Sequence, residues 1–148
     1  MSDETAVAAL QGTLAAEHAA VYVFGALGGR AAVLGDSPLR PALATAYDTH
    51  LARRDEVRAL VTAAGGDPVA AQPAYALPRP LTTSAQITAE ALRVQRSCVA
   101  TYAALVAATT GPDRAWAVAT LSAGALEELA FGGPPEALPG LPPGYARG

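Results

Sequence analysis

The stretch LQGTLAAEHAAVYVFGAL, residues 10–27, decides the fold that we expect for this chain. Apolar side chains recur in and just before it at spacings of three and four, which places them on one face of a helix. They are Val7, Leu10, Leu14, Val21 and Phe24. Glu17 falls on the same face. Because a carboxylate in an apolar seam is costly to bury alone, the stretch also raises the question of what pairs with Glu17.

The helical pattern recurs in three further segments, and glycine and proline residues punctuate them. We expect helices over about Asp3 to Leu34, Pro38 to Ala64, Thr83 or Ser84 to Thr110, and Pro112 or Asp113 to Phe131. Ser37 is expected to cap the second helix. The inward face of the fourth is expected to carry Val118, Leu121, Leu126 and Leu129.

A proline-rich stretch separates the second and third helices. Residues 67–81 contain Pro68, Pro73, Pro78 and Pro80. Extended chain of this length spans roughly 45 Å at about 3.1 Å per residue, whereas a helix of about 25 residues is roughly 37 Å long. The stretch can therefore run the whole length of a bundle. We predict an all-α, ferritin-like four-helix bundle over residues 1–131, with two antiparallel hairpins joined by this Pro-rich crossover, and a Pro/Gly-rich tail over residues 132–148.

Composition narrows the class of partner. The 148 residues suffice for about one domain, and 51% are apolar while only 16% are charged. So little charge leaves apolar surface to cover, which predicts a homodimer.

The net charge of −3 and the absence of a basic cluster argue against nucleic acid as a partner, and no segment has the pattern of a signal peptide or membrane span. A single cysteine, Cys98, fits a reducing compartment, so we expect a cytoplasmic protein.

Counting residues from the two predicted hairpin turns places several polar side chains at one level of the bundle. They are Glu17, His50, Arg53 or Arg54, Gln95, and Glu127 or Glu128. The favoured interpretation is a core polar cluster of Glu17, His50, Arg53 and Arg54, in which Glu17 pairs with one arginine. Breaking such a buried pair typically costs about 3–5 kcal/mol.

The alternative interpretation is a metal site. Its ligands would be drawn from Glu17, His18, His50, Glu127 and Glu128, and its metal would be iron, manganese or zinc. The di-metal pattern of ferritin-like proteins needs Glu-x-x-His on two helices, and this sequence contains none. We therefore expect no cofactor and no catalytic residue. Cys98 is expected to be an inert buried thiol without a neighbouring base, and Glu90 a surface charge.

The chain resembles the small ferritin-like proteins of high-GC bacteria that form a domain of unknown function (DUF4439-like). The matching stretches are AAEHAAVYVFGALGGR at 15–30, HLARRDEVRALV at 50–61, DPVAAQPAYALP at 67–78 and TTSAQITAEAL at 82–92. The resemblance implies a four-helix fold, often a dimer, and no established activity. The sequence thus favours a non-catalytic binding or scaffold bundle, with an unidentified small ligand or none. The alternative is a metalloprotein with an unorthodox Glu/His site.

Overall fold

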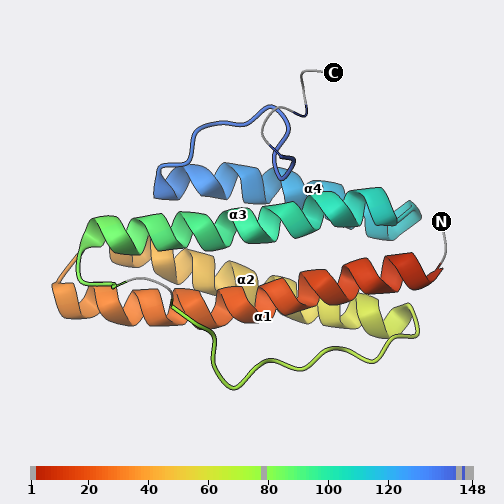
Figure 1. Ribbon diagram of the computed structural model, residues 1–148, viewed down its shortest axis with the longest axis horizontal. Helices are drawn as coiled ribbons and strands as arrows, with labels where there is room; N and C mark the ends of the chain where they lie inside the picture. The colour runs from red at the N-terminus through yellow and green to blue at the C-terminus, as the bar shows by residue number, and fades with distance from the viewer. Residues whose placement is uncertain (1–2, 78–79, 143–144, 146–148) are drawn as a thin grey trace.

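The computed structural model describes residues 3–77, 80–142 and 145 (Figure 1). Parts of three predictions lie outside the described residues: 1–2 of the predicted bundle, 78–79 of the predicted crossover, and 143–144 and 146–148 of the predicted tail. The described residues form four α-helices and one short 3-10 helix, and they contain no strand. The all-α prediction is therefore confirmed.

The helices pair as two hairpins that form a four-helix bundle (Figure 1). Their bounds are α1 Asp3–Leu34, α2 Leu39–Ala63, α3 Ser84–Ala108 and α4 Gly111–Glu127, followed by the 3-10 helix η1 Glu128–Phe131. Helix α1 packs against both α2 and α3, and α3 packs against α4. None of the described helices combines the length and the apolarity needed to cross a membrane.

The helix starts depend on local hydrogen bonds. At α3, the Thr83 side chain accepts from the Gln86 backbone N–H while the Gln86 side chain accepts from the Thr83 N–H, which is a capping box. At α2, the predicted cap by Ser37 is wrong. The Asp36 carboxylate accepts from the Leu39 backbone N–H at 3.1 Å instead, because the turn places position 36, and not 37, three residues before an unpaired N–H.

After α2, the segment of described residues up to 77 runs along α1 (Figure 1). The Gln11 side chain bridges it twice, since its amide N–H donates to the Asp67 carbonyl at 2.6 Å and its carbonyl oxygen accepts from the Val69 N–H at 2.9 Å. Further along, the rings of Tyr22 and Tyr75 lie 5.5 Å apart. These contacts hold the segment against α1 over about three helical turns.

The core has two apolar regions with polar residues between them. One region includes Phe24 of α1 and Leu43 of α2, and the other includes Leu14 of α1 and Val57 of α2. Along α1, Glu17 falls between Leu14 and Phe24, and along α2, His50 falls between Leu43 and Val57. Polar side chains are thus concentrated in one layer near the middle of the bundle.

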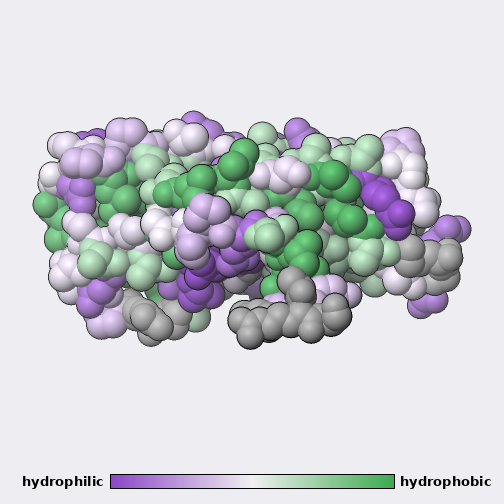
Figure 2. Space-filling view, turned by 90° about the horizontal axis from the view of Figure 1, so that it is seen from above, coloured by the Kyte–Doolittle hydropathy of each residue, from purple (hydrophilic) through white to green (hydrophobic). Residues whose placement is uncertain are grey.

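The predicted inward face of the fourth helix is largely wrong. Val118, Leu126 and Leu129 are 46%, 68% and 46% exposed, and only Leu121 packs against the core. The buried residues of α4 are small: Ala117, Thr120 and Gly124. Close packing of α4 on α3 selects these small side chains and turns Val118 and Leu126 outward. Figure 2 views the molecule of Figure 1 from above and shows broad apolar areas on the outer surface of the bundle.

We expect Gly124→Leu to destabilise the bundle by about 1–3 kcal/mol. A Cβ at position 124 would lie 3.0 Å from Val99 and 3.2 Å from Tyr102, so a leucine has no room between α3 and α4. The measurement is the free energy of unfolding in urea. Gly12→Leu is the matched control, because a Cβ at Gly12 meets nothing within 4 Å. Equal losses in the two variants would contradict close packing at Gly124.

Candidate functional site

Glu17 lies at the centre of the buried polar layer, with 0% of its surface exposed. Two side chains from two other helices satisfy its carboxylate. The Tyr102 hydroxyl of α3 donates to Oε1, and the His50 Nδ1 of α2 lies 2.7 Å from Oε2. The charge-assisted character of these contacts is what makes burial of a carboxylate tolerable. Glu17 therefore fixes the relative positions of α1, α2 and α3.

The other ring nitrogen of His50 shows where its protons lie. His50 Nε2 is 3.0 Å from Gln95 Oε1, while Gln95 Nε2 donates to the Gly124 carbonyl and to Glu127 Oε2 at 2.9 Å. Because the amide nitrogen of Gln95 is used on α4, its oxygen is left to accept from His50. His50 thus donates at Nε2, and a further proton lies between His50 Nδ1 and Glu17. The Glu17–His50 pair shares this proton and carries no net charge.

Arg53 and Glu127 close the layer on the side of α2 and α4. Both NH groups of Arg53 donate to the two carboxylate oxygens of Glu127 at 2.7 Å, which is a bidentate ion pair. The guanidinium also lies over the Tyr102 ring, 5.5 Å from its centroid. Burial lowers the pKa of Arg53, but the hydrogen bonds to Glu127 and the neighbouring negative charges raise it by more, so Arg53 stays charged.

The structure brings together Glu17, His50, Gln95, Arg53 and Glu127 from the predicted layer, but it pairs them differently. The predicted contact of Glu17 with Arg53 or Arg54 is wrong, since Glu17 contacts His50 and Tyr102 and Arg53 contacts Glu127. Arg54 turns away and pairs with Asp55, 2.8 Å away at the surface. Successive helical residues point about 100° apart, so only one arginine of the pair can face inward.

The two other proposed ligands lie outside the layer. His18 is buried, and its Nε2 lies 3.0 Å from the Val69 carbonyl of the segment that follows α2. Glu128 is buried against Arg96, whose Nε donates to it at 3.2 Å. Burial raises the pKa of Glu128, and the hydrogen bond from Arg96 opposes this rise.

The prediction that Glu90 is a surface charge is also wrong. Its side chain is buried, and Arg93 one turn later donates to both of its oxygens at 2.5 and 2.9 Å. The Arg93 side chain is 48% exposed, so its stem covers the carboxylate while its charge reaches water. This ion pair belongs to α3 alone and does not join the central layer.

Sequence reasoning missed two members of the layer, Cys98 and Tyr102. One ligand atom from each of Glu17, His50 and Cys98 lies within 4.8 Å of the other two, so Cys98 does have acid–base neighbours. The sequence does contain a pattern that indicates this placement. Gln95, Cys98 and Tyr102 are spaced by three and four residues and therefore share one face of α3. The buried group of Glu17, His50 and Cys98 offers oxygen, nitrogen and sulfur and could hold a metal ion.

Every polar atom of the layer already has a protein partner. Among the described residues, no buried side-chain nitrogen or oxygen lacks a hydrogen bond. Glu17 and His50 are fully buried, so neither can contact a substrate in this conformation. The arrangement can store and share a proton, but a metal ion would have to displace the proton between Glu17 and His50.

We expect Arg53→Met to destabilise the protein by more than about 1 kcal/mol, and by less than the 3–5 kcal/mol of a fully buried pair, because Glu127 is a third exposed. Arg54→Met, one residue later, should change stability by less than about 0.5 kcal/mol. The measurement is urea unfolding of both variants. Equal effects would show that Arg53 and Arg54 are equivalent, contrary to the structure.

We expect stability to fall at alkaline pH. Burial, and then the neighbouring Glu17 carboxylate, raise the pKa values of Cys98 and Tyr102 well above their usual ranges. The folded protein therefore holds these protons while the unfolded chain releases them, above about pH 8.5 for cysteine and about pH 10 for tyrosine. This stabilisation is complete below those values and is lost as the pH rises.

Urea unfolding between pH 7 and 11 measures this dependence. Cys98→Ala should flatten the fall between about pH 8.5 and 10, where the thiol dominates. Tyr145→Phe serves as the control because Tyr145 is 68% exposed. The same slope for wild type and Cys98→Ala would contradict the role of the buried thiol.

Comparison with known proteins gives a family and a structural neighbour. The fold is similar to that in the crystal structure of a conserved hypothetical protein, rv2844, from Mycobacterium tuberculosis, with a TM-score of 0.82 and 26% sequence identity over 89% of this chain and 98% of that one. No curated protein matches the chain. The family described as Domain of unknown function (DUF4439) matches residues 9–143, and the chain therefore belongs to it.

Proposed function

We propose that this protein is a non-catalytic binding or scaffold bundle, and that its central layer is a structural hydrogen-bond and ion-pair network. The bidentate contact of Arg53 with Glu127 is the observation that carries this proposal. The positively charged Arg53 side chain, bound by the Glu127 carboxylate, lies in the central layer. In a metal-binding bundle of this kind, that layer holds the metal ion and its ligands.

Electrostatics favour a network over a metal centre. Arg53 remains protonated at any physiological pH, and it already occupies both oxygens of Glu127, a carboxylate that a metal ion in this layer could otherwise use as a ligand. Gln95 adds to this effect, because its amide fills the space between His50 and Glu127 with a neutral group whose bonds are already made. The layer is therefore better suited to holding helices in register than to coordinating an ion.

A relationship to ferritin-like proteins is part of this proposal. Two features support it: the layer lies near mid-bundle, and a long segment connects α2 to α3. Both Glu-x-x-His pairs are missing from the sequence, so ferroxidase and iron-storage activity do not carry over.

A second candidate is a metalloprotein, and the cluster of Glu17, His50 and Cys98 favours it. A carboxylate, an imidazole and a thiolate form a donor set that zinc accepts, and iron and manganese are also candidates. Binding would require the Cys98 thiol and the shared Glu17–His50 proton to leave. Of the ligands expected from sequence, this site would use Glu17 and His50 but not His18, Glu127 or Glu128.

Elemental analysis distinguishes the two candidates. We expect protein purified without chelators to contain far less than one equivalent of zinc, iron or manganese, and to gain none on dialysis against each metal. Stoichiometric metal in the wild type that is lost in both Glu17→Ala and Cys98→Ala would establish the metal site and overturn the network proposal. His18→Ala is the control, since His18 lies outside the cluster and should leave the metal content unchanged.

A further inference from the structure

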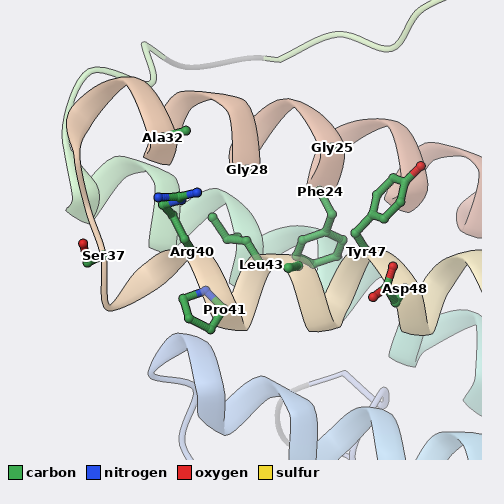
Figure 3. A pocket seen from close by; sticks show the side chains of 11 residues that line it. Phe24, Gly25, Gly28, Ala32, Ser37, Arg40, Pro41, Leu43, Tyr47 and Asp48 are labelled. Carbon is green, nitrogen blue, oxygen red and sulfur yellow. The ribbon is translucent and has the colours of Figure 1, made fainter.

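A groove runs along the outer surface between the second half of α1 and the first half of α2 (Figure 3). It has a volume of about 580 Å³. Phe24 and Leu43 form its floor, and both are almost completely buried. Arg40 and Asp48, both on α2, lie towards the two ends of the groove (Figure 3). The groove is thus apolar in the middle and oppositely charged at its ends.

Gly28 keeps the wall of the groove low on the α1 side. A Cβ at this position would meet nothing within 4 Å, so packing within the chain does not require a glycine there. Glycine in a helix interior is destabilising relative to alanine. The open space at Gly28 is therefore a feature that another molecule can use, since it allows close approach to the α1 backbone.

Arg40 and Asp48 have complementary charges that cannot neutralise each other within one chain. Eight residues separate them on α2, which is roughly 12 Å along the helix. In the described part of the chain, neither side chain has a hydrogen-bond or ion-pair partner. Ala44, a small residue that also lines the groove, lies midway between them.

This pattern is self-complementary under a two-fold rotation. If a second α2 lies antiparallel across the first and the two cross at Ala44, each Arg40 comes level with the partner's Asp48. The same operation brings each Pro41 level with the partner's Tyr47, so apolar contacts flank the charged ones. An interface of a two-fold dimer must match itself in this way.

We propose that the groove is a homodimer interface in which α2 of a second copy of this chain packs antiparallel against it around Ala44. Arg40 of each protomer then pairs with Asp48 of the partner, and Gly28 admits the partner helix. A second copy fits better than a small ligand, because the groove is open along its length and a small-molecule site normally buries most of its ligand. The low charge content, 16% of residues, agrees with a covered apolar face.

Light scattering at micromolar concentration tests the proposal on the intact chain. We expect a mass of about 29.8 kDa, which is twice the 14.9 kDa of one chain. Arg40→Asp and Asp48→Arg should each raise the dimer dissociation constant at least about tenfold, because each places like charges together at two symmetric sites. The double variant Arg40→Asp/Asp48→Arg should restore the dimer. Arg58→Asp, elsewhere on the exposed side of α2, is the charge control.

Filling the groove provides a second test. Gly28→Leu should also dissociate the dimer, whereas Gly29→Leu, on the same helix but outside the groove, should leave it intact. A Cβ at either glycine meets nothing, so both variants should fold, and circular dichroism and thermal melting check this.

Several results would overturn the proposal. A monomeric wild type would do so, and if that monomer bound an apolar dye that Gly28→Leu excludes, the groove would be a small-molecule site instead. A dimer that survives both single charge reversals, or that the double variant fails to restore, would also overturn it. Loss of the dimer in Leu129→Glu alone would move the interface to the exposed face formed by α4 and η1. Because Glu17 and His50 do not line the groove, metal content and dimerisation are tested independently.

Discussion

The burial of one carboxylate, that of Glu17, is the constraint on which the arrangement of the helices depends. Its oxygens have no access to water and take donors from His50 on α2 and Tyr102 on α3. A shift of one helix by a turn would leave an unpaired charge in a medium of low dielectric, which is among the most costly changes that a core can suffer. Glu17 therefore fixes the register of α1, α2 and α3 relative to one another.

The network extends this constraint to the fourth helix. The Gln95 side chain is hydrogen-bonded to both His50 and Glu127. Arg53 of α2 also donates to Glu127, so α2, α3 and α4 are linked through this layer. The rings of Phe24 and His50 are stacked, with their centroids 5.1 Å apart. Phe24 therefore lies between the polar layer and the apolar region that includes Leu43. The proton between Glu17 and His50 leaves this pair without net charge, which lowers the cost of burying the two groups together.

The interior and the surface of this bundle have an unusual distribution of polarity. Charged groups are few, and several of them are buried, so the outside is correspondingly apolar. Val118 and Leu126 of α4, Leu129 of η1, and the groove between α1 and α2 all face outward. The proposed dimer would cover part of this apolar outside.

The sequence by itself determined the helices and the level of the polar layer. The periodicity of residues 10–27 placed Glu17 in a core seam, and residue counts from the two turns brought His50, Gln95 and Glu127 to the same height. Only the tertiary structure decided that Arg53 and Glu127 turn inward while Arg54 and Glu128 do not join them. It also gave Glu17 its partners and turned Leu126 and Leu129 outward. Spacing along a helix fixes height, but the rotation of each helix about its axis depends on how closely its neighbours pack, as Gly124 shows on α4.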